Sequence, residues 1–385
     1  MNQPPRPSDY PTFSINTTSS AIPARAPEPP RRRRLFILPI ALAVALAGIG
    51  GGLVGAATHS DAASVIIEQA RSETAIPARP VISSTSIDAE SVGIAVIPSI
   101  VTVEVGSGTG DAFRKAGSGS GVVLDHAGHI VTNNHVVQAG TSMRVVLSDG
   151  RVYEADLVGT DPVTDLAVVH VPTTDLDPIT FGSTNGLEVG SPVVAVGSPL
   201  GLEGGPSLSV GVISALGREV QTGPDNILYG EIQTDAPITS GSSGGSLVDA
   251  RGALLGITTA VGVSNIGAEG IGFATPIEVV DRVTGEIIAT GSASHALLGI
   301  TGITEYNETG DGGFAPVGVS VGTVSPGSPA EAAGIAADDV ITAVNGVTVR
   351  TMDELISVLR TVSAGDVVMV SLAGSSPVSV TLSDS

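Results

Sequence analysis

The chain has 385 residues, no cysteine, no tryptophan and a formal net charge of −21 at pH 7. This length is enough for two or three domains with sizeable cores. The missing cysteines exclude disulfides, Cys-based zinc sites and thiol nucleophiles, and the acidic balance argues against nucleic acid as a partner. Many glycines, many β-branched residues and few aromatics favour a β-rich protein with numerous turns.

The amino end combines a polar tail with an uncharged run. Residues 1–34 are rich in Pro, Ser and Thr and end on four arginines, so we expect a disordered cytoplasmic tail. Residues 35–57 carry no charge and as a helix would be about 34 Å long, enough to cross the lipid bilayer. We predict a single-pass transmembrane anchor there, which would place the later residues outside the cytoplasm. A cleaved signal peptide is the alternative, because small residues end this run.

The next segments show a change of pattern near residue 91. Residues 58–90 have no sustained period and are predicted to be a linker. Short apolar runs follow, and two of their connections, Asp125–Gly128 and Ser148–Gly150, read as hairpin turns. No helical period is sustained in this region, so we expect sheets closed into barrels. The predicted strands are Ile100–Val105, Gly121–Leu124, His129–Thr132, Met143–Leu147, Arg151–Val158, Asp165–Val171 and Pro192–Val196.

A glycine-flanked serine lies in the stretch T-D-A-P-I-T-S-G-S-S-G-G-S at residues 234–246. Ser243 follows Gly241 and Ser242 and precedes Gly244 and Gly245, which permits a tight turn around an exposed hydroxyl. In such a turn the backbone amides of Gly241 and Ser243 can converge on one point and form an oxyanion hole. Taken alone, this composition is more often a loop or linker.

Two upstream motifs supply the partners that a nucleophilic serine needs. His135 stands in T-N-N-H-V and could take the proton of Ser243, and Asp165 in T-D-L-A-V could hold the other ring nitrogen. Each motif alone is typical of an ordinary strand end or turn. The order His, Asp, Ser in a β-rich chain favours a catalytic triad for acyl transfer.

These motifs resemble the HtrA (Deg) family of serine proteases, in its membrane-anchored bacterial type with one PDZ domain. The resemblance covers residues 92–383, and the matching text is G-S-G-S-G-V-V-L-D-H-A-G-H-I-V-T-N-N-H-V-V, T-D-L-A-V-V, G-S-P-L-G-L, G-V-I-S-A-L-G-R and the serine turn. It implies a mainly β fold, with a chymotrypsin-like double β-barrel protease domain over 91–291 and a PDZ domain over 292–385. It also implies His135 as general base, Asp165 as orienting carboxylate and Ser243 as nucleophile of an endopeptidase that cleaves unfolded or damaged proteins. The family is usually built of homotrimers.

The serine turn departs from the family's usual N-P-G-N-S-G-G-P. Thr239 and Ser242 replace asparagines, and Ser240 and Ser246 replace prolines. Losing the prolines removes two fixed φ angles, which we expect to affect rate more than role, because the backbone amides remain. The alternative function is a catalytically weak chaperone or peptide-binding scaffold of the same architecture.

The resemblance also indicates the pocket for the substrate residue before the cut bond. Pro237 should form its floor with Ile238 beside it, and Thr259 and Ile271 should belong to its walls. None of these side chains is charged. We therefore predict cleavage after small or medium aliphatic residues.

The sequence of the carboxyl-terminal part predicts a second, small β-rich domain. Ile277–Thr290 has apolar positions at helical spacing and should close the protease domain. Three further elements are predicted after it. Gly327–Ile335 has a Ser-Pro helix start, Asp338–Gly346 is a strand that leads into an Asn-Gly turn, and Met352–Leu359 is a helix.

This pattern resembles a PDZ domain of the HtrA kind, with Asp338 where the family usually has glycine. A PDZ domain binds an extended peptide as an added strand, and the backbone amides of Leu298, Gly299 and Ile300 would receive the terminal carboxylate of a substrate or regulatory peptide. The histidines outside the triad show no metal-ligand spacing, and no cofactor is expected.

Overall fold

The computed structural model describes residues 87–198, 205–222, 226–259 and 270–384. The predicted tail at 1–34, the anchor at 35–57 and nearly all of the linker at 58–90 lie outside these ranges. Among the helices in the described ranges, none is both long and apolar enough to cross a membrane.

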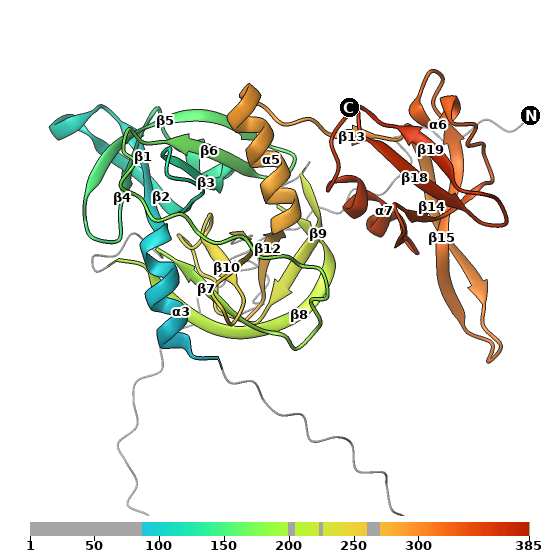
Figure 1. Cartoon of the computed structure of the whole chain (residues 1–385), viewed down its shortest axis with the longest axis horizontal. Coiled ribbons are helices and arrows are strands. Elements are labelled where there is room, and N and C mark those ends of the chain that lie inside the picture. The colour runs from blue at the N-terminus through green and yellow to red at the C-terminus, as the bar shows by residue number, and fades with distance from the viewer. Residues whose placement is uncertain (1–86, 199–204, 223–225, 260–269, 385) are drawn as a thin grey trace, which may run out of the picture. The chain divides into compact units, whose positions relative to one another are not determined.

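Six strands form the first barrel, which closes in the order β1-β2-β3-β6-β5-β4 (Figure 1). Its interior is filled by small branched side chains such as Val103, Ile130 and Val169, which are fully buried. Both predicted hairpin turns are present, and Gly128 and Gly150 have φ values of 103° and 90°, which only glycine adopts freely. The strands are β1 (Ile100–Ser107), β2 (Arg114–Val123), β3 (His129–Asn133), β4 (Ser142–Val146), β5 (Val152–Asp161) and β6 (Leu166–His170).

The second barrel closes in the order β10-β11-β12-β9-β8-β7. Its interior is again apolar and includes Val193, Ile232 and Leu255. One carboxylic acid, Glu231, is fully buried on β9. The strands are β7 (Pro192–Gly197), β8 (Ser207–Gln221), β9 (Ile227–Thr234), β10 (Ser246–Val248), β11 (Leu254–Thr259) and β12 (Gly272–Pro276).

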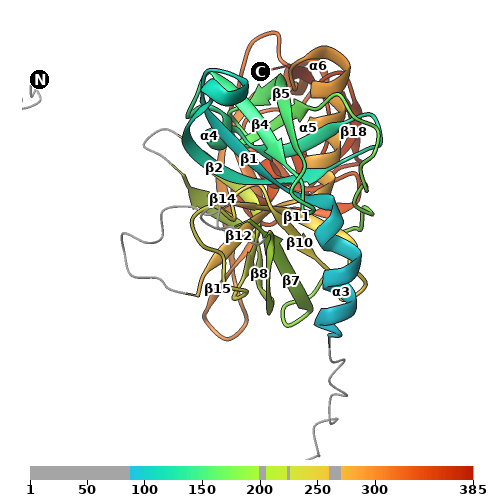
Figure 2. The same ribbon diagram turned by 90° about the vertical axis from the view of Figure 1, so that its left-hand side faces the viewer.

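A third apolar core fixes the two barrels against each other. It combines side chains of both barrels with those of helices α3 (Ala89–Val96) and α5 (Ile277–Thr290). The ribbons of both helices lie against the barrels in Figures 1 and 2. Helix α5 has the predicted bounds and ends at Gly291, whose φ of 86° gives the left-handed cap. Because this seam is filled by buried apolar side chains, groups that face it from opposite barrels hold fixed positions. Three short helices complete this part: η2 (Ile97–Ser99), η3 (Gly110–Ala112) and α4 (Asn134–Val137).

Helix α3 corrects the expectation that the segment before residue 91 is only linker. It begins at Ala89, and Asp88 caps it by accepting a hydrogen bond from the Ser91 amide at 3.1 Å. Val92 and Val96 bury their side chains in the core of the seam. The helix therefore exists through packing on the barrels, which a local periodicity does not reveal.

The carboxyl-terminal sheet has the order β14-β15-β16-β18-β19, with β17 paired to β16. The predicted turn at Asn345 and Gly346 has φ values of 50° and 80°, typical of a two-residue hairpin. Asp338 has a φ of 71°, so the position where the family usually has glycine keeps a left-handed backbone. The elements are β13 (Ala296–Leu297), β14 (Ile300–Glu308), β15 (Phe314–Val324), α6 (Pro329–Ala332), β16 (Val340–Val344), β17 (Val347–Thr348), α7 (Met352–Leu359), β18 (Val367–Leu372), β19 (Val378–Thr381) and β20 (Ser383–Asp384), which pairs with β13.

Candidate active site

An imidazole and a carboxylate meet where β3 and β6 pair. Asn133 at the end of β3 faces Leu166 at the start of β6, so the residues just beyond them are neighbours. The Nδ1 of His135 lies 2.6 Å from Oδ2 of Asp165, and the His135 amide donates to Oδ1 at 3.0 Å. The Asp165 side chain is 7% exposed and that of His135 is 47% exposed. The buried carboxylate thus fixes the ring through Nδ1 and leaves Nε2 for a substrate-facing role.

The backbone of Asp165 is held in an unusual conformation. Its φ is 56°, which non-glycine residues seldom adopt. Its carbonyl accepts hydrogen bonds from the Asn134 amide and from Nδ2 of Asn133, both at 2.9 Å. These bonds tie the carboxylate to the segment that carries His135.

The serine turn has the tight geometry that its glycines predict. Gly241 and Gly244 have φ values of 90° and 84°. The Ser242 amide donates to the Thr239 carbonyl and the Gly245 amide to the Ser242 carbonyl, each at 2.9 Å. A Cβ on Gly244 would lie 2.2 Å from the Ser120 carbonyl oxygen, so only glycine fits there. This contact brings Ser243 against the first barrel.

Ser120 on β2 fastens the serine turn to the first barrel. Its amide donates to the Ser243 carbonyl at 2.7 Å, and its hydroxyl donates to the Gly241 carbonyl at 2.8 Å. The Ser120 carbonyl accepts from Oγ1 of Thr132 at 2.7 Å. Thr132 lies on β3, three residues before His135, so one strand positions the base and also anchors the turn of the nucleophile. The sequence reasoning missed Ser120, although the small-residue run G-S-G-S-G around it hints at a close approach of backbones.

Two family models match the chain in the expected places. A trypsin-like peptidase domain matches residues 119–257, and a PDZ domain matches residues 320–373. The chain is 34% identical to the serine protease PepD of Mycobacterium tuberculosis over 95% of this chain and 81% of that protein. It is 39% identical to the periplasmic serine endoprotease DegP of Escherichia coli over 68% of this chain and 55% of that protein.

The chain belongs to the HtrA family of serine proteases. Solved structures agree with this assignment. The HtrA-type protease AlgW with a tripeptide superimposes with a TM-score of 0.59 at 29% identity, over 77% of this chain and 97% of that one. The serine endoprotease of Yersinia pestis gives a TM-score of 0.53 at 32% identity, over 78% and 99%. This HtrA protein is therefore a serine endopeptidase with a PDZ domain.

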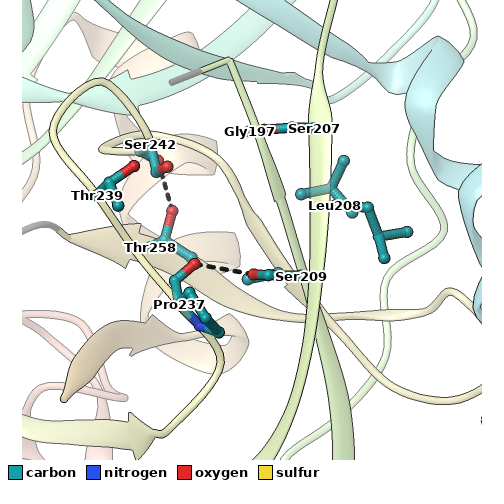
Figure 3. Close-up of a pocket in the computed structure, with 10 residues that line it drawn as sticks. Gly197, Ser207, Leu208, Ser209, Pro237, Thr239, Ser242 and Thr258 are labelled. Atoms are coloured by element: carbon teal, nitrogen blue, oxygen red, sulfur yellow. Dashed lines mark hydrogen bonds between the residues drawn. The ribbon is translucent and has the colours of Figure 1, made fainter. Parts of the chain in front are cut away.

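A cavity of about 210 Å³ adjoins the serine turn of this HtrA protease (Figure 3). Pro237 lines it, and its carbonyl accepts from the Ser209 hydroxyl at 2.8 Å. Oγ1 of Thr258 donates to the Ser242 carbonyl at 2.7 Å and closes another side. The remaining lining side chains are uncharged and come from β7, β8 and the turn.

The other three predicted pocket residues do not line this cavity. Ile238 packs over Gly272, where a Cβ would lie 2.6 Å from its Cδ1. Thr259 is 2% exposed, and its Oγ1 accepts from Nδ2 of Asn133 at 3.3 Å, across the seam. Ile271 is 39% exposed. Thr259 thus joins the serine side of the site to the histidine side.

The residues that replace the family's asparagines and prolines have different surroundings. Thr239 and Ser242 line the cavity, and Ser240 is exposed. Ser246 is fully buried on β10, and its hydroxyl has no hydrogen-bond partner within the described residues. An unpaired buried hydroxyl is destabilising by about 1–3 kcal/mol.

A second carboxylic acid lies near the triad and was not anticipated. Glu231 is fully buried and accepts one weak hydrogen bond, from Oγ1 of Thr275 at 3.2 Å, while its Oε1 has no partner among the described groups. Burial raises the pKa of Glu231 to about 8, and the negative charge of Asp165 adds to this rise, although Arg360 and Thr275 oppose it. Glu231 is therefore protonated at neutral pH.

The histidines outside the triad include one with an unexpected partner. His126 and His129 flank their turn, and Nδ1 of His129 lies 2.7 Å from Oδ2 of Asp125. The rings of His129 and His170 are 5.4 Å apart. His295 is mostly buried and pairs with Asp161 at 2.9 Å. Across the ranges the structure describes, no cluster of His, Asp or Glu side chains is suited to a metal ion.

An apolar cavity of about 280 Å³ adjoins the predicted carboxylate-binding residues of the PDZ domain, and Val163, Ile227 and Tyr229 of the protease domain also line it. Leu298, Gly299 and Ile300 line it, between β13 and β14. Gly299 has a φ of 80°, and a Cβ there would lie 2.3 Å from the Cβ of Ser328, so the sharp approach of this loop needs glycine. Helix α7 supplies the opposite wall with Met352, Leu355, Ile356 and Leu359.

Proposed function

We propose that this HtrA protein is a membrane-tethered, extracytoplasmic endoprotease that cleaves unfolded or damaged polypeptides by a Ser-His-Asp acyl-enzyme mechanism. The observation that carries the catalytic part is that β3 leads to the His135–Asp165 pair and also anchors the turn of Ser243. Its role in the cell would be protein quality control under stress.

The proposed mechanism uses each group once in each half-reaction. Oγ of Ser243 attacks the scissile carbonyl while Nε2 of His135 takes its proton, and Asp165 stabilises the imidazolium. The amides of Gly241 and Ser243 bind the oxyanion. The proton then passes from His135 to the leaving amine, and water hydrolyses the acyl-enzyme with His135 again as base.

The adjacent serines give a sharp test of this mechanism. Ser243→Ala is expected to abolish casein digestion and covalent labelling by a fluorophosphonate. Ser242→Ala should keep both, because its side chain lines the cavity and its carbonyl is already bonded to Thr258. The reverse outcome would overturn the assignment of the nucleophile.

A second candidate, a scaffold that binds chains without cutting them, is favoured by the substitutions in the serine turn. Four residues differ from the family's pattern there, and one of them, Ser246, has a buried hydroxyl with no hydrogen-bond partner among the described residues. The two functions separate in one assay of the unmodified protein. Binding of unfolded casein without its digestion would support the scaffold.

The uncharged cavity beside the serine turn supports a preference for small or medium aliphatic residues before the cut bond. The described residues that line it include no carboxylate that would favour Lys or Arg. Digestion of a randomised peptide library, with the cleavage sites read by mass spectrometry, tests this. Cleavage mainly after Lys or Arg would contradict the proposal.

The PDZ cavity supports binding of apolar carboxyl-terminal peptides of substrates or regulators. Its walls are mainly apolar, and Leu298, Gly299 and Ile300 line it together with residues of helix α7. Isothermal titration should detect binding of a peptide with an apolar carboxyl-terminal residue. It should detect no binding of the same peptide when its terminal carboxylate is amidated. Equal binding of both would argue against carboxylate recognition.

The membrane tether and the trimer are proposals from sequence and family. The tether is supported by the uncharged run at 35–57 after four arginines. Protein that starts near residue 58 and washes free of membranes would contradict it. A homotrimer is proposed from the family, and light scattering in detergent tests it.

A further inference from the structure

Two side chains of the PDZ domain reach the turn that precedes Asp165. Arg360 follows helix α7, and its Nη2 donates to the Val163 carbonyl at 2.6 Å. Its Nη1 donates to the Tyr229 carbonyl on β9 at 2.8 Å. Arg360 is 8% exposed, so its guanidinium is taken from water and directed at two backbone carbonyls of the protease domain.

His295 holds the same turn at its other end. Its Nε2 lies 2.9 Å from Oδ1 of Asp161, a carboxylate that is 3% exposed. Asp161 also shapes the turn, because it accepts from the Val163 amide at 3.2 Å and from the Thr164 hydroxyl at 2.5 Å. The turn Asp161–Asp165 is therefore bound by PDZ side chains at two of its residues.

The position of Arg360 is itself fixed by helix α5 of the protease domain. Nε of Arg282 donates to the Arg360 carbonyl at 2.9 Å, and its Nη1 donates to the Ser294 carbonyl at 2.9 Å. Glu286 on the same helix accepts from the Ser294 amide at 2.6 Å and from the Ser363 hydroxyl. Helix α5 thus fixes the backbone from which the Arg360 side chain extends.

The turn needs such a hold because Asp165 has a left-handed backbone. A non-glycine residue in that region is typically strained by about 1–3 kcal/mol and persists only where its surroundings fix it. After Asp165 the chain is fixed by β6, and the Asp165 carbonyl is bound by Asn133 and Asn134. Before Asp165 the turn is held by hydrogen bonds from Arg360 and His295 and by the side chain of its own Asp161. In addition, Nδ2 of Asn226 donates to the Pro162 carbonyl at 3.2 Å.

We propose that Arg360 is a positioning residue for catalysis, which holds the Asp161–Asp165 turn through the Val163 carbonyl and so keeps the Asp165 carboxylate aimed at His135. The proposal rests on the proposed triad and adds to it a group from another domain, 195 positions along the chain from Asp165. His295 supports the same turn through Asp161.

The test compares Arg360→Ala and Arg360→Lys with Arg350→Ala in the full-length protein. Arg350 is a matched control, because it is an arginine of the same domain that is mostly exposed and lies 3.9 Å from its ion-pair partner Glu354. The readouts are kcat and KM for a short internal peptide capped at both ends, and the rate of fluorophosphonate labelling. Urea unfolding reports whether each variant is folded.

We expect Arg360→Ala to lower kcat about tenfold to a hundredfold with KM nearly unchanged, since a small misplacement of a catalytic group has effects of that size. The rate of labelling should fall in parallel. Added ethylguanidinium should restore part of kcat in Arg360→Ala, which general destabilisation would not allow. Arg360→Lys should be intermediate, because one ammonium cannot reproduce the planar fork that serves two carbonyls. Arg350→Ala should match the unmodified protein.

Unchanged kcat in folded Arg360→Ala would overturn the proposal, and so would a loss of kcat that ethylguanidinium does not rescue. If Arg360→Ala does not fold, Arg360→Lys decides, and an unchanged kcat in that folded variant counts against the proposal. Failure of the proposed function itself looks different, since the unmodified protein would then neither cut the peptide nor react with the fluorophosphonate.

Discussion

The replacement of Glu231 by glutamine should stabilise this protease, and the gain should grow with pH. Glu231 is fully buried and has a pKa of about 8 in the folded protein, against 4.5 for an ordinary glutamate. The folded state therefore binds more protons than the unfolded state between these values. It follows that the contribution of Glu231 is most favourable below about pH 4.5 and is lost as the pH rises through about 8.

The size of the effect follows from the difference between the two pKa values. Each unit corresponds to about 1.4 kcal/mol, so Glu231 makes folding less favourable by about 3 kcal/mol at pH 7 and by about 5 kcal/mol above pH 8, relative to its effect in acid. Glutamine has nearly the same shape, can still accept from the Thr275 hydroxyl and carries no charge. The Glu231→Gln protein should thus equal its parent near pH 4.5 and exceed its stability by those amounts at higher pH.

The assay is urea unfolding followed by far-ultraviolet circular dichroism at about pH 5, 7 and 9, with stability read from the unfolding midpoint. Both proteins carry Ser243→Ala to prevent self-digestion. Glu219→Gln is the matched control, because Glu219 is an exposed glutamate on the neighbouring strand β8. A Glu231→Gln protein that is less stable than its parent at pH 7 would refute the reasoning. That result would mean that Glu231 is ionised and paired with Arg360, since removing one partner of a buried pair is destabilising by about 3–5 kcal/mol.

Three further substitutions test the serine turn and the triad. Gly244→Ala should abolish fluorophosphonate labelling, because its Cβ would lie 2.2 Å from the Ser120 carbonyl oxygen, whereas Gly186→Ala, with a φ of 78° and open space around it, should keep full labelling. Ser246→Ala should raise the free energy of unfolding by about 1 kcal/mol, since it removes a buried hydroxyl that has no partner in the described part of the chain; a loss of stability in urea would contradict this. Asp165→Asn should lower kcat by about three to four orders of magnitude while circular dichroism stays unchanged, and a smaller loss would question its role in orienting the imidazole.

Local signals in the sequence predicted much of the secondary structure. The Asn345-Gly346 turn, the hairpin turns at Gly128 and Gly150, and helix α5 are all present as expected. Each depends on the φ preference of a few residues or on one periodicity, so neighbouring residues carry the information. Helix α3 was missed for the opposite reason, because it is stabilised by packing of Val92 and Val96 into the seam between barrels.

The active site also depends partly on local motifs and partly on contacts between distant parts of the chain. The motifs around His135 and Asp165 predict a pair, and the structure brings these side chains to 2.6 Å. The groups that surround them are harder to recognise in the sequence. Ser120 is an ordinary strand serine in the sequence, Glu231 has the alternation of an exposed strand residue, and Arg360 follows a short amphipathic helix. Their roles appear only when the closed barrels and the PDZ domain bring them close to the triad and to the turns that carry it.

The pKa of Glu231 also predicts how catalysis should depend on pH on the alkaline side. While Glu231 is protonated, the charge of Arg360 acts on the carbonyls of Val163 and Tyr229. Once it ionises, it attracts the Arg360 guanidinium and repels the carboxylate of Asp165, and both effects disturb the turn.

The kcat of the unmodified enzyme should therefore fall as the pH rises through about 8, and in Glu231→Gln this alkaline fall should disappear. The measurement is kcat for a capped peptide between about pH 6 and 10, with Glu219→Gln as the control that keeps the fall. A fall of equal size and midpoint in both variants would show that another group governs the alkaline limb. In that case the buried carboxyl would affect stability alone, because its ionisation would leave the aim of Asp165 unchanged.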